Sequence, residues 1–467
     1  MVHPIEGDMA YRRSPRPLLK TAILGAAISI LLLAIIMPLW LPRAVRMVIP
    51  DRYLVAYAPE FVKDIVFNES AGEALPTLAP LELQAQEDLM AQLERLAQST
   101  PSPLPTLQNT GGLATPEAGP PSTLTPAVLA ENATAAPTAV PPIPSYVLLT
   151  GFTYEAQGWN NCGPATLAMM LSHWSLTDDQ FSVVAKIKPH PEDSNVRPDE
   201  LVYYIKSRGL GAISRINGSL DTMKRLIAAG YPVMIERGFP AGELEGEDWM
   251  GHFMLLIGYS EESQEFYTLD SFWGWRHARE DRGFPVDYWD SARLDDTWRH
   301  FNRVYVVAFP PTDYDRVAEI IGEDMDDQVM YAKALQNAYA ETRAYDDTFA
   351  YYNLGSVLAL TGDYSNAATA FDLARERVLP WRMYWYQFDL YEAYYQAGRY
   401  EDVLTLAQYT ADITNYPESE EAYYYIGRVY AARGQIAAAR SAFNRALSYN
   451  TTFQRARDAL AALDAQG

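Results

Sequence analysis

The sequence contains a single cysteine, Cys162, among 467 residues. One thiol excludes any disulfide within the chain, so the folded domains depend on core packing. A lone cysteine is more often a small buried apolar residue than a nucleophile, and its neighbours must decide its role. The one cysteine and the six scattered histidines also lack the spacing of a metal site. We therefore expect neither a metal nor a cofactor.

Positive charge is also scarce, because 37 Lys and Arg stand against 59 Asp and Glu, for a net charge of −22. A chain this acidic is not expected to bind nucleic acid through a basic surface, since phosphate contacts need Lys and Arg. The sequence has no Gly-x-x-x-x-Gly-Lys-Ser/Thr motif, so no ATP-binding cassette is expected. The length, with 49% hydrophobic residues, allows two or three domains.

Charge is missing altogether between Lys20 and Arg43. The uncharged run over residues 21–41 is long enough to cross a bilayer core of about 30 Å as a helix. A buried core helix and a cleavable signal peptide are the alternatives, but no small-x-small cleavage site follows the run, which favours an uncleaved anchor. Basic residues flank the run on both sides, so the charge bias is slight. We expect residues 1–20 to be a cytoplasmic tail and the body of the chain to lie outside the cytoplasm.

The segment after the expected anchor changes character twice. Residues 42–98 are expected to be a juxtamembrane region with a helix near residues 81–96. Residues 99–145 contain no Lys or Arg but 11 prolines, and they cannot bury enough apolar surface to fold. We expect this segment to be an extended, disordered tether, with an ordinary inter-domain spacer as the alternative.

A globular pattern follows over residues 146–311. Helix-like segments come first and strand-like segments cluster later, which is typical of an α+β domain. The pattern predicts helices over residues 167–173, 198–208 and 220–229, and strands over residues 232–236, 253–259, 266–270 and 304–309.

Residues 326–467 are predicted to be helical and to repeat. Gly362, Gly398 and Gly434 lie 36 residues apart. Such a period predicts stacked helix pairs. The spacing Tyr-x-x-Leu-Gly, then Gly-x-Tyr, then Ala-x-x-x-Phe-x-x-Ala resembles the tetratricopeptide repeat, which implies an all-α solenoid.

The repeats differ in quality. Residues 350–381 and 422–453 match the pattern well. The middle repeat, over residues 386–417, is degenerate, with Tyr391 at the expected glycine and Ala407 at the expected aromatic. One helix before the repeats and one after them are expected to cap the stack.

The neighbours of Cys162 predict that it begins a helix. Asn161 is a good N-cap residue, and Pro164 is tolerated in a first helical turn. Residues 165–171 then continue as an apolar helix. At a helix N-terminus the macrodipole favours thiolate over thiol, so this is an activating position.

A nucleophile needs a base, and His252 is the one histidine that opens an apolar strand. Strands over residues 252–259 and 265–270 are predicted to form an antiparallel hairpin. A turn centred on residue 261 would place His252 directly opposite Asp270, with their Cβ atoms about 5 Å apart. A centre one residue later would disturb this pairing, and the sequence does not fix the register. Taken alone, either residue could equally be structural.

The combination resembles a known family. Gln-x-x-x-x-Cys-Gly-Pro-Ala, then Gly-His-Phe before an apolar strand, then an Asp closing the next strand, resembles the bacterial bacteriocin-processing-type cysteine peptidases, family thirty-nine, and its stand-alone relatives. The resemblance covers about residues 145–310 and implies a papain-like fold. It implies Cys162 as nucleophile, His252 as general base and acid, Asp270 as the residue that orients the imidazole, and Gln157 as oxyanion donor.

Two departures limit the resemblance. Many relatives carry Asp before the cysteine, where this chain has Asn161. Without an ATP-binding cassette, the family's double-glycine leader substrate does not transfer to this chain.

The expected partners are a peptide or protein substrate, a membrane, and a protein bound by the repeats. Tyr352, Tyr395 and Tyr425 lie beside consensus positions on first helices, and we expect them to line a concave binding face, with packing between repeats as the alternative. A catalytically silent scaffold and an acyl or γ-glutamyl transferase are the rival functions.

Overall fold

The computed structural model describes the chain in blocks. The membrane anchor expected over residues 21–41 and most of the linker expected over residues 99–145 lie outside these blocks. Among the helices that are described, none is both long enough and apolar enough to span a bilayer. The described residues are 83–98, 143–190, 195–239, 249–272, 286–412 and 419–465, with Pro76, Leu78 and Asp193.

An antiparallel sheet forms the centre of the first globular region. Its strand order is β2-β7-β3-β4-β5-β6, and β1 pairs with β4. The predicted strands correspond to β3, β4, β5 and β7, whereas the short β1, β2 and β6 escape prediction. The strands are β1 Tyr146–Leu148, β2 Gly211–Arg215, β3 Val233–Phe239, β4 Met250–Ser260, β5 Glu265–Leu269, β6 Asp287–Asp290 and β7 Tyr305–Phe309.

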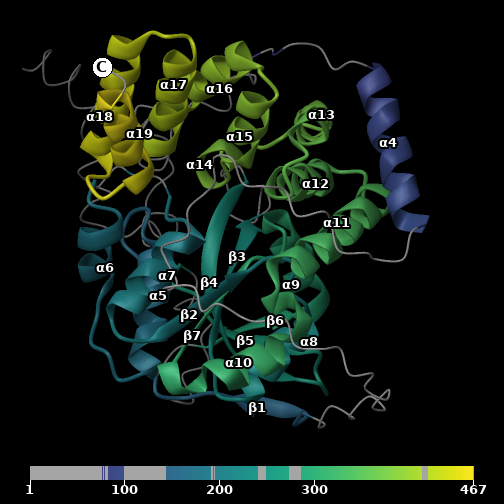
Figure 1. The fold of residues 1–467 in the computed structure, drawn as a ribbon. Helices are drawn as coiled ribbons and strands as arrows, with labels where there is room; N and C mark the ends of the chain where they lie inside the picture. Colours follow the sequence, from purple (N-terminus) through teal and green to yellow (C-terminus); the bar gives the residue numbers. More distant parts are fainter. Residues whose placement is uncertain are drawn as a thin grey trace, which may run out of the picture. The chain divides into compact units, whose positions relative to one another are not determined.

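Helices cover both faces of this sheet (Figure 1). Alternate residues of β4 point to opposite faces, so Phe253 and Leu255 pack under α5–α7 while Met254 and Leu256 pack under α8–α10. This mixed architecture agrees with the predicted α+β domain. The helices are α5 Cys162–His173, α6 Gln180–Ile187, α7 Pro198–Ser207, α8 Leu220–Ala228, α9 Ser291–Trp298 and α10 Tyr314–Ile321, with short 3-10 turns at Arg299–Phe301, Pro311–Asp313 and Gly322–Met325.

The C-terminal region is helical, and its turns explain the period in the sequence. Gly362, Gly398 and Gly434 each follow the first helix of a pair, with φ of +83°, +74° and +71°. Glycine adopts positive φ without strain and so ends a helix well. The helices are α11 Asp327–Ala344, α12 Thr348–Leu360, α13 Tyr364–Glu376, α14 Met383–Tyr386, α15 Asp389–Gln396, α16 Tyr400–Asp412, α17 Glu420–Ala432, α18 Ile436–Tyr449 and α19 Gln454–Asp464.

Small residues let the two helices of a pair approach each other closely. A Cβ added at Gly355 would lie 2.8 Å from the Phe371 ring, and one added at Gly427 would lie 2.5 Å from the Phe443 ring. These distances are shorter than a carbon contact allows. Glycine on the first helix and phenylalanine on the second are therefore complementary in size.

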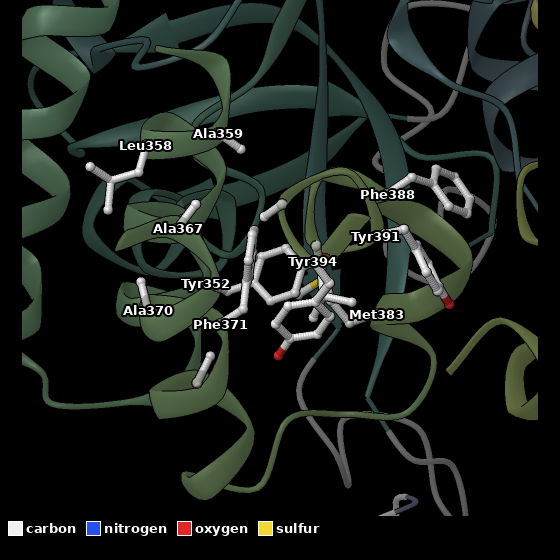
Figure 2. Close-up of a cluster of buried hydrophobic side chains, with 14 of the residues drawn as sticks. Tyr352, Leu358, Ala359, Ala367, Ala370, Phe371, Met383, Phe388, Tyr391 and Tyr394 are labelled. Carbon is white, nitrogen blue, oxygen red and sulfur yellow. The ribbon is translucent and has the colours of Figure 1, made fainter. Parts of the chain in front are cut away.

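The middle pair exchanges the two sizes. Tyr391 stands where the other pairs have glycine, Ala407 stands where they have phenylalanine, and both are completely buried. The Tyr391 hydroxyl shares a hydrogen bond of 2.5 Å with Thr410 Oγ1 on the second helix. Figure 2 shows Tyr391 in the buried cluster with Tyr352 and Phe371. In the repeat that looks degenerate in the sequence, the first helix thus carries the large side chain and the second helix the small one.

The expectation that tyrosines beside consensus positions line a binding face is wrong for two of the three. Tyr352 is 0% exposed and Tyr425 is 3% exposed. The Tyr425 hydroxyl donates to Glu392 Oε2 at 3.1 Å, and Tyr395 is half-buried, with the guanidinium of Arg428 3.9 Å from its ring centre. These side chains fill space between successive helix pairs, where burying their apolar surface lowers the free energy of the folded state.

Helix α4 Leu83–Gln98 lies where a helix is expected near residues 81–96. It packs on α11 and α13 and buries Leu89 and Leu93 in the core of the C-terminal helices. Gln92 Nε2 donates to Asp363 Oδ2 at 3.2 Å. The segment expected to be juxtamembrane therefore contributes a helix to the C-terminal region.

The sheet region and the C-terminal helices are in direct contact. Trp249 and Phe301 belong to the same buried cluster as the helices. Arg299 Nη2 pairs with Asp347 Oδ2 at 2.6 Å, and Asn353 Nδ2 donates to the backbone carbonyl of Arg299 at 2.6 Å. The two regions are therefore packed against each other rather than merely linked.

Candidate active site

Cys162 is the first residue of α5, as the sequence predicts, and it is partly exposed. Asn161 occupies the N-cap position but makes no capping hydrogen bond, because its Nδ2 donates instead to Gln180 Oε1 at 3.2 Å. No Asn161 oxygen therefore competes with the sulfur for the helix N-terminus. The helix dipole can then act on a thiolate at Cys162.

The loop before the nucleophile is held by α6. Gln180 Oε1 accepts the Gly158 N–H at 2.6 Å, while Gln180 Nε2 donates to Glu155 Oε1 at 2.8 Å. Lys188 Nζ donates to the Asn160 carbonyl at 2.6 Å. These bonds fix the backbone that leads into Cys162, which positions the sulfur.

A β-bulge brings His252 and Asp270 to one face of the hairpin. Ile257 is an extra residue in β4 with no opposite residue on β5. Beyond it, the ladder ends with Leu255 opposite Leu269. Extending it by one residue puts Met254 opposite Asp270, with His252 two positions further along β4 on the same face. Without the bulge Asp270 would stand opposite Leu255, and His252 would point away. The directly opposite pairing expected from the sequence is therefore wrong, and the pair is diagonal.

The imidazole and the carboxylate are bonded and buried. His252 Nε2 lies 3.0 Å from Asp270 Oδ1, which also accepts the Phe272 N–H at 2.7 Å. Because Asp270 engages Nε2, the ring nitrogen left for Cys162 is Nδ1. The rings of Phe239 and Phe272 lie 4.9 Å and 6.5 Å from the imidazole and shield it from water.

Cys162 and His252 shift each other towards the ionised pair. Burial raises the pKa of the Cys162 thiol, but the hydrogen bond and charge of His252, the Phe253 backbone and the charge of Lys188 together lower it below its usual value. Burial lowers the pKa of His252, but Asp270 and Cys162 outweigh it and raise that pKa to about 9. A thiolate–imidazolium pair at neutral pH is the state that a nucleophilic cysteine needs.

Gln157 is tied to the residue after Asp270. Its backbone N–H donates to the Ser271 carbonyl at 3.0 Å, and the Ser271 hydroxyl donates to Gln157 Oε1 at 2.9 Å. A bond to the amide oxygen directs the amide nitrogen the other way. The structure thus brings Cys162, His252 and Asp270 together, and it anchors Gln157 beside them through Ser271.

Two further residues reach the nucleophile without any prediction from the sequence. Glu236 on β3 and Tyr386 on α14 line a cavity of about 10 Å³ together with Cys162. A charged residue inside an apolar strand is the signal that could have marked Glu236. Tyr386 lies too far along the chain for any local pattern to connect it with Cys162.

Comparisons with known proteins give one family match and one similar solved structure. Residues 149–304 match the model of the "Peptidase_C39 like family". A crystal structure described as that of a "putative C39-like peptidase" from Bacillus anthracis is similar over 35% of this chain and 96% of that chain, at 17% identity and a TM-score of 0.28. A likeness at that level says nothing about the reaction. The search of curated proteins gives no match. The family match supports a Peptidase_C39-like domain over residues 149–304, in a class of cysteine peptidases.

Proposed function

We propose that the protein is a cysteine peptidase in which Cys162 is the nucleophile. The observation that carries this proposal is that Cys162, at the start of α5, meets the buried pair of His252 and Asp270. A scaffold without catalysis would gain nothing from burying the imidazole of His252 and the carboxylate of Asp270, because burying such groups costs free energy.

The reaction has two steps. The thiolate attacks the scissile carbonyl carbon, and the C–N bond breaks as His252 Nδ1 gives its proton to the departing amine. Water, losing a proton to Nδ1, then hydrolyses the thioester. Asp270 holds the imidazole, while Gln157 Nε2 and the Cys162 backbone N–H stabilise the oxyanion.

Cleavage of a peptide library tests the assignment. Wild type should cut, whereas Cys162→Ala should not, with its circular dichroism and melting nearly unchanged because the side chain is small and partly exposed. Turnover by the alanine variant would overturn the assignment. An added amine acceptor that captures the acyl group in place of water would identify a transferase.

We propose that residues 21–41 anchor the protein in a membrane and that residues 99–145 tether it outside the cytoplasm. The uncharged run and the proline-rich composition support this. Protease added to intact cells should cut within the tether. Since α4 packs on the C-terminal helices, the cut body should stay at the surface until denatured. A cut seen only after lysis would reverse the orientation.

We propose that the C-terminal helix pairs are tetratricopeptide-type repeats that bind a protein partner or substrate. A groove of about 380 Å³ among α16, α17 and α18 supports this, and Tyr423, Ile426 and Tyr430 line it. Tyr430→Ala should slow cleavage of a protein substrate and leave short-peptide cleavage unchanged. An equal effect on both substrates would contradict recruitment.

A further inference from the structure

Glu236 has a buried carboxyl group with no partner among the described residues. It lies in β3 opposite Phe253 and is 5% exposed. Within the described part of the chain, neither a hydrogen bond nor an ion pair involves its carboxyl oxygens. A carboxyl buried this way costs free energy, so the fold alone gives no reason to keep it.

A second polar group without a partner lies in the same cavity. Asn195 is 6% exposed, and its Nδ2 makes no hydrogen bond to any residue that the structure describes. Glu236 and Asn195 line the cavity with Cys162, and Gly251 and Tyr386 complete its wall. One acceptor and one donor, both unsatisfied, thus border the same space as the nucleophile.

The cavity restricts what can enter. Its volume of about 10 Å³ has room for roughly one water-sized group. An ammonium group has that size, whereas a planar guanidinium is larger. A carboxyl satisfies an ammonium group, and the Asn195 amide can donate to a carbonyl oxygen beside it.

We propose that Glu236 and Asn195 form a subsite for a primary ammonium group of the substrate, next to the bond that Cys162 attacks. The group is either a lysine side chain or the substrate's own α-amine, and both offer the same chemistry. The proposal rests on Cys162 being the catalytic nucleophile.

Electrostatics gives the subsite a dependence on pH. Burial and the charge of Cys162 raise the pKa of Glu236 well above its usual value. An arriving ammonium group favours the carboxylate and displaces its proton. Preference for ammonium should therefore increase as pH rises.

A test that needs no turnover uses the uniqueness of the thiol, since every thiol reagent reports on Cys162 alone. Modification rates are compared for aminoethyl methanethiosulfonate, which carries an ammonium group, and for its neutral methyl analogue. The ratio of the two rates cancels changes in thiolate reactivity. Glu236→Gln should lower this ratio tenfold or more, from a charge pair about 5 Å apart.

The matched control is Glu262→Gln, which makes the same change in net charge at an exposed turn. Its ratio should equal that of wild type. An equal ratio in Glu236→Gln would overturn the proposal. If that variant does not fold, Glu236→Asp replaces it, because its shorter side chain moves the carboxyl away from the cavity and should also lower the ratio; an equal ratio there overturns the proposal.

The source of the ammonium group is tested with peptides that carry a thiol-reactive epoxide. Lysine is compared with norleucine, and a free α-amine with an acetylated one. The subsite is supported if one ammonium peptide labels wild type faster than its uncharged counterpart does, and if Glu236→Gln shows no such difference. The peptide that is preferred then identifies the source of the ammonium group. No preference for either overturns it. If wild type cleaves no peptide but Glu236→Gln still lowers the ratio of modification rates, the proposed peptidase function is contradicted while the ammonium subsite stands.

Discussion

At the scale of single residues, the site depends on how Asp270 acts on His252. Asp270 is 0% exposed and bonded to Nε2, so its charge is little screened and favours the imidazolium. The reactive ion pair exists above the pKa of Cys162, which is lowered, and below that of His252, near 9. Activity should therefore fall at both ends of the pH range.

Asp270→Asn should move the alkaline limit of kcat/KM to lower pH, because the imidazolium loses the charge that raises its pKa. The measurement is the pH profile of peptide cleavage in wild type and variant. If Asp270 only supported the fold, the substitution would lower kcat/KM at every pH without moving the alkaline limit. An unmoved limit would contradict the role assigned to Asp270.

The sequence predicts the position of a residue when its near neighbours in the chain determine it. Asn161 and Pro164 mark the helix start at Cys162, and the structure has it there. Asn161 is the N-cap residue, as predicted, but its side chain makes no capping bond and donates to Gln180 Oε1. Glu236 is missed because its position beside Cys162 depends on tertiary packing.

At the scale of elements, the β4–β5 hairpin shows why register escapes prediction. Counting residues across a turn assumes an unbroken ladder, and the extra residue Ile257 breaks it. Gly258 follows the bulge, and a Cβ there would lie 2.5 Å from the Val147 carbonyl oxygen. Strand β1 therefore approaches β4 closely right beside the bulge, and β1 is itself too short to be predicted.

The helix pairs allow a test of size complementarity. Tyr391→Gly should destabilise the protein by about 2–5 kcal/mol through an unfilled cavity. Ala407→Phe should cost about 1–3 kcal/mol through overpacking. The double variant reproduces the arrangement of the outer pairs and should recover part of the loss. Urea unfolding of the four proteins measures the coupling, and simple additivity would show that the two positions do not compensate.

The pairs also show what the period reveals and what it hides. The glycines predict where each pair turns, because positive φ leaves a signature in the sequence. The period does not reveal that α4 packs on these helices from more than 200 residues away in the chain. The hydrogen bond between Gln92 and Asp363 is one such contact. Such contacts have no local signal.

At the scale of the whole molecule, a buried polar cluster joins the two regions. Asn450 Nδ2 donates to Glu420 Oε1 at 2.8 Å and to Glu200 Oε1 at 3.3 Å. Burial raises the pKa of Glu200 to about 7, and it raises that of Glu420 well above its usual value. The charged groups that meet here are Lys188, Asp193, Arg197, Glu200, Glu420 and Glu421.

This cluster predicts a fall in stability as pH rises. An acid whose pKa is raised on folding binds more protons in the folded state, so its stabilising effect is complete below its unfolded pKa and is lost as pH rises through about 7. The melting temperature should be higher near about pH 5 than near about pH 8. Glu420→Gln should flatten this dependence, and the exposed Glu262→Gln should not. A Tm that rises with pH in wild type would contradict the account.

The shared interface also decides how the repeats can be studied. Removing residues 326–467 would take Tyr386 from the cavity beside Cys162 and uncover Trp249 and Phe301. Loss of activity in such a fragment would not separate recruitment from damage to the site. Single substitutions in the groove of α16–α18 keep the interface intact.

The central claim is that the thiolate of Cys162 breaks peptide bonds, and one titration tests it most directly. Iodoacetamide is added in increments at about pH 6, where an ordinary thiol reacts slowly. Intact mass gives the modified fraction of this single thiol, and peptide cleavage is measured on the same samples. The account predicts that cleavage falls in proportion to modification, and that His252→Ala reacts far more slowly. Full cleavage by protein whose Cys162 is completely alkylated would contradict it.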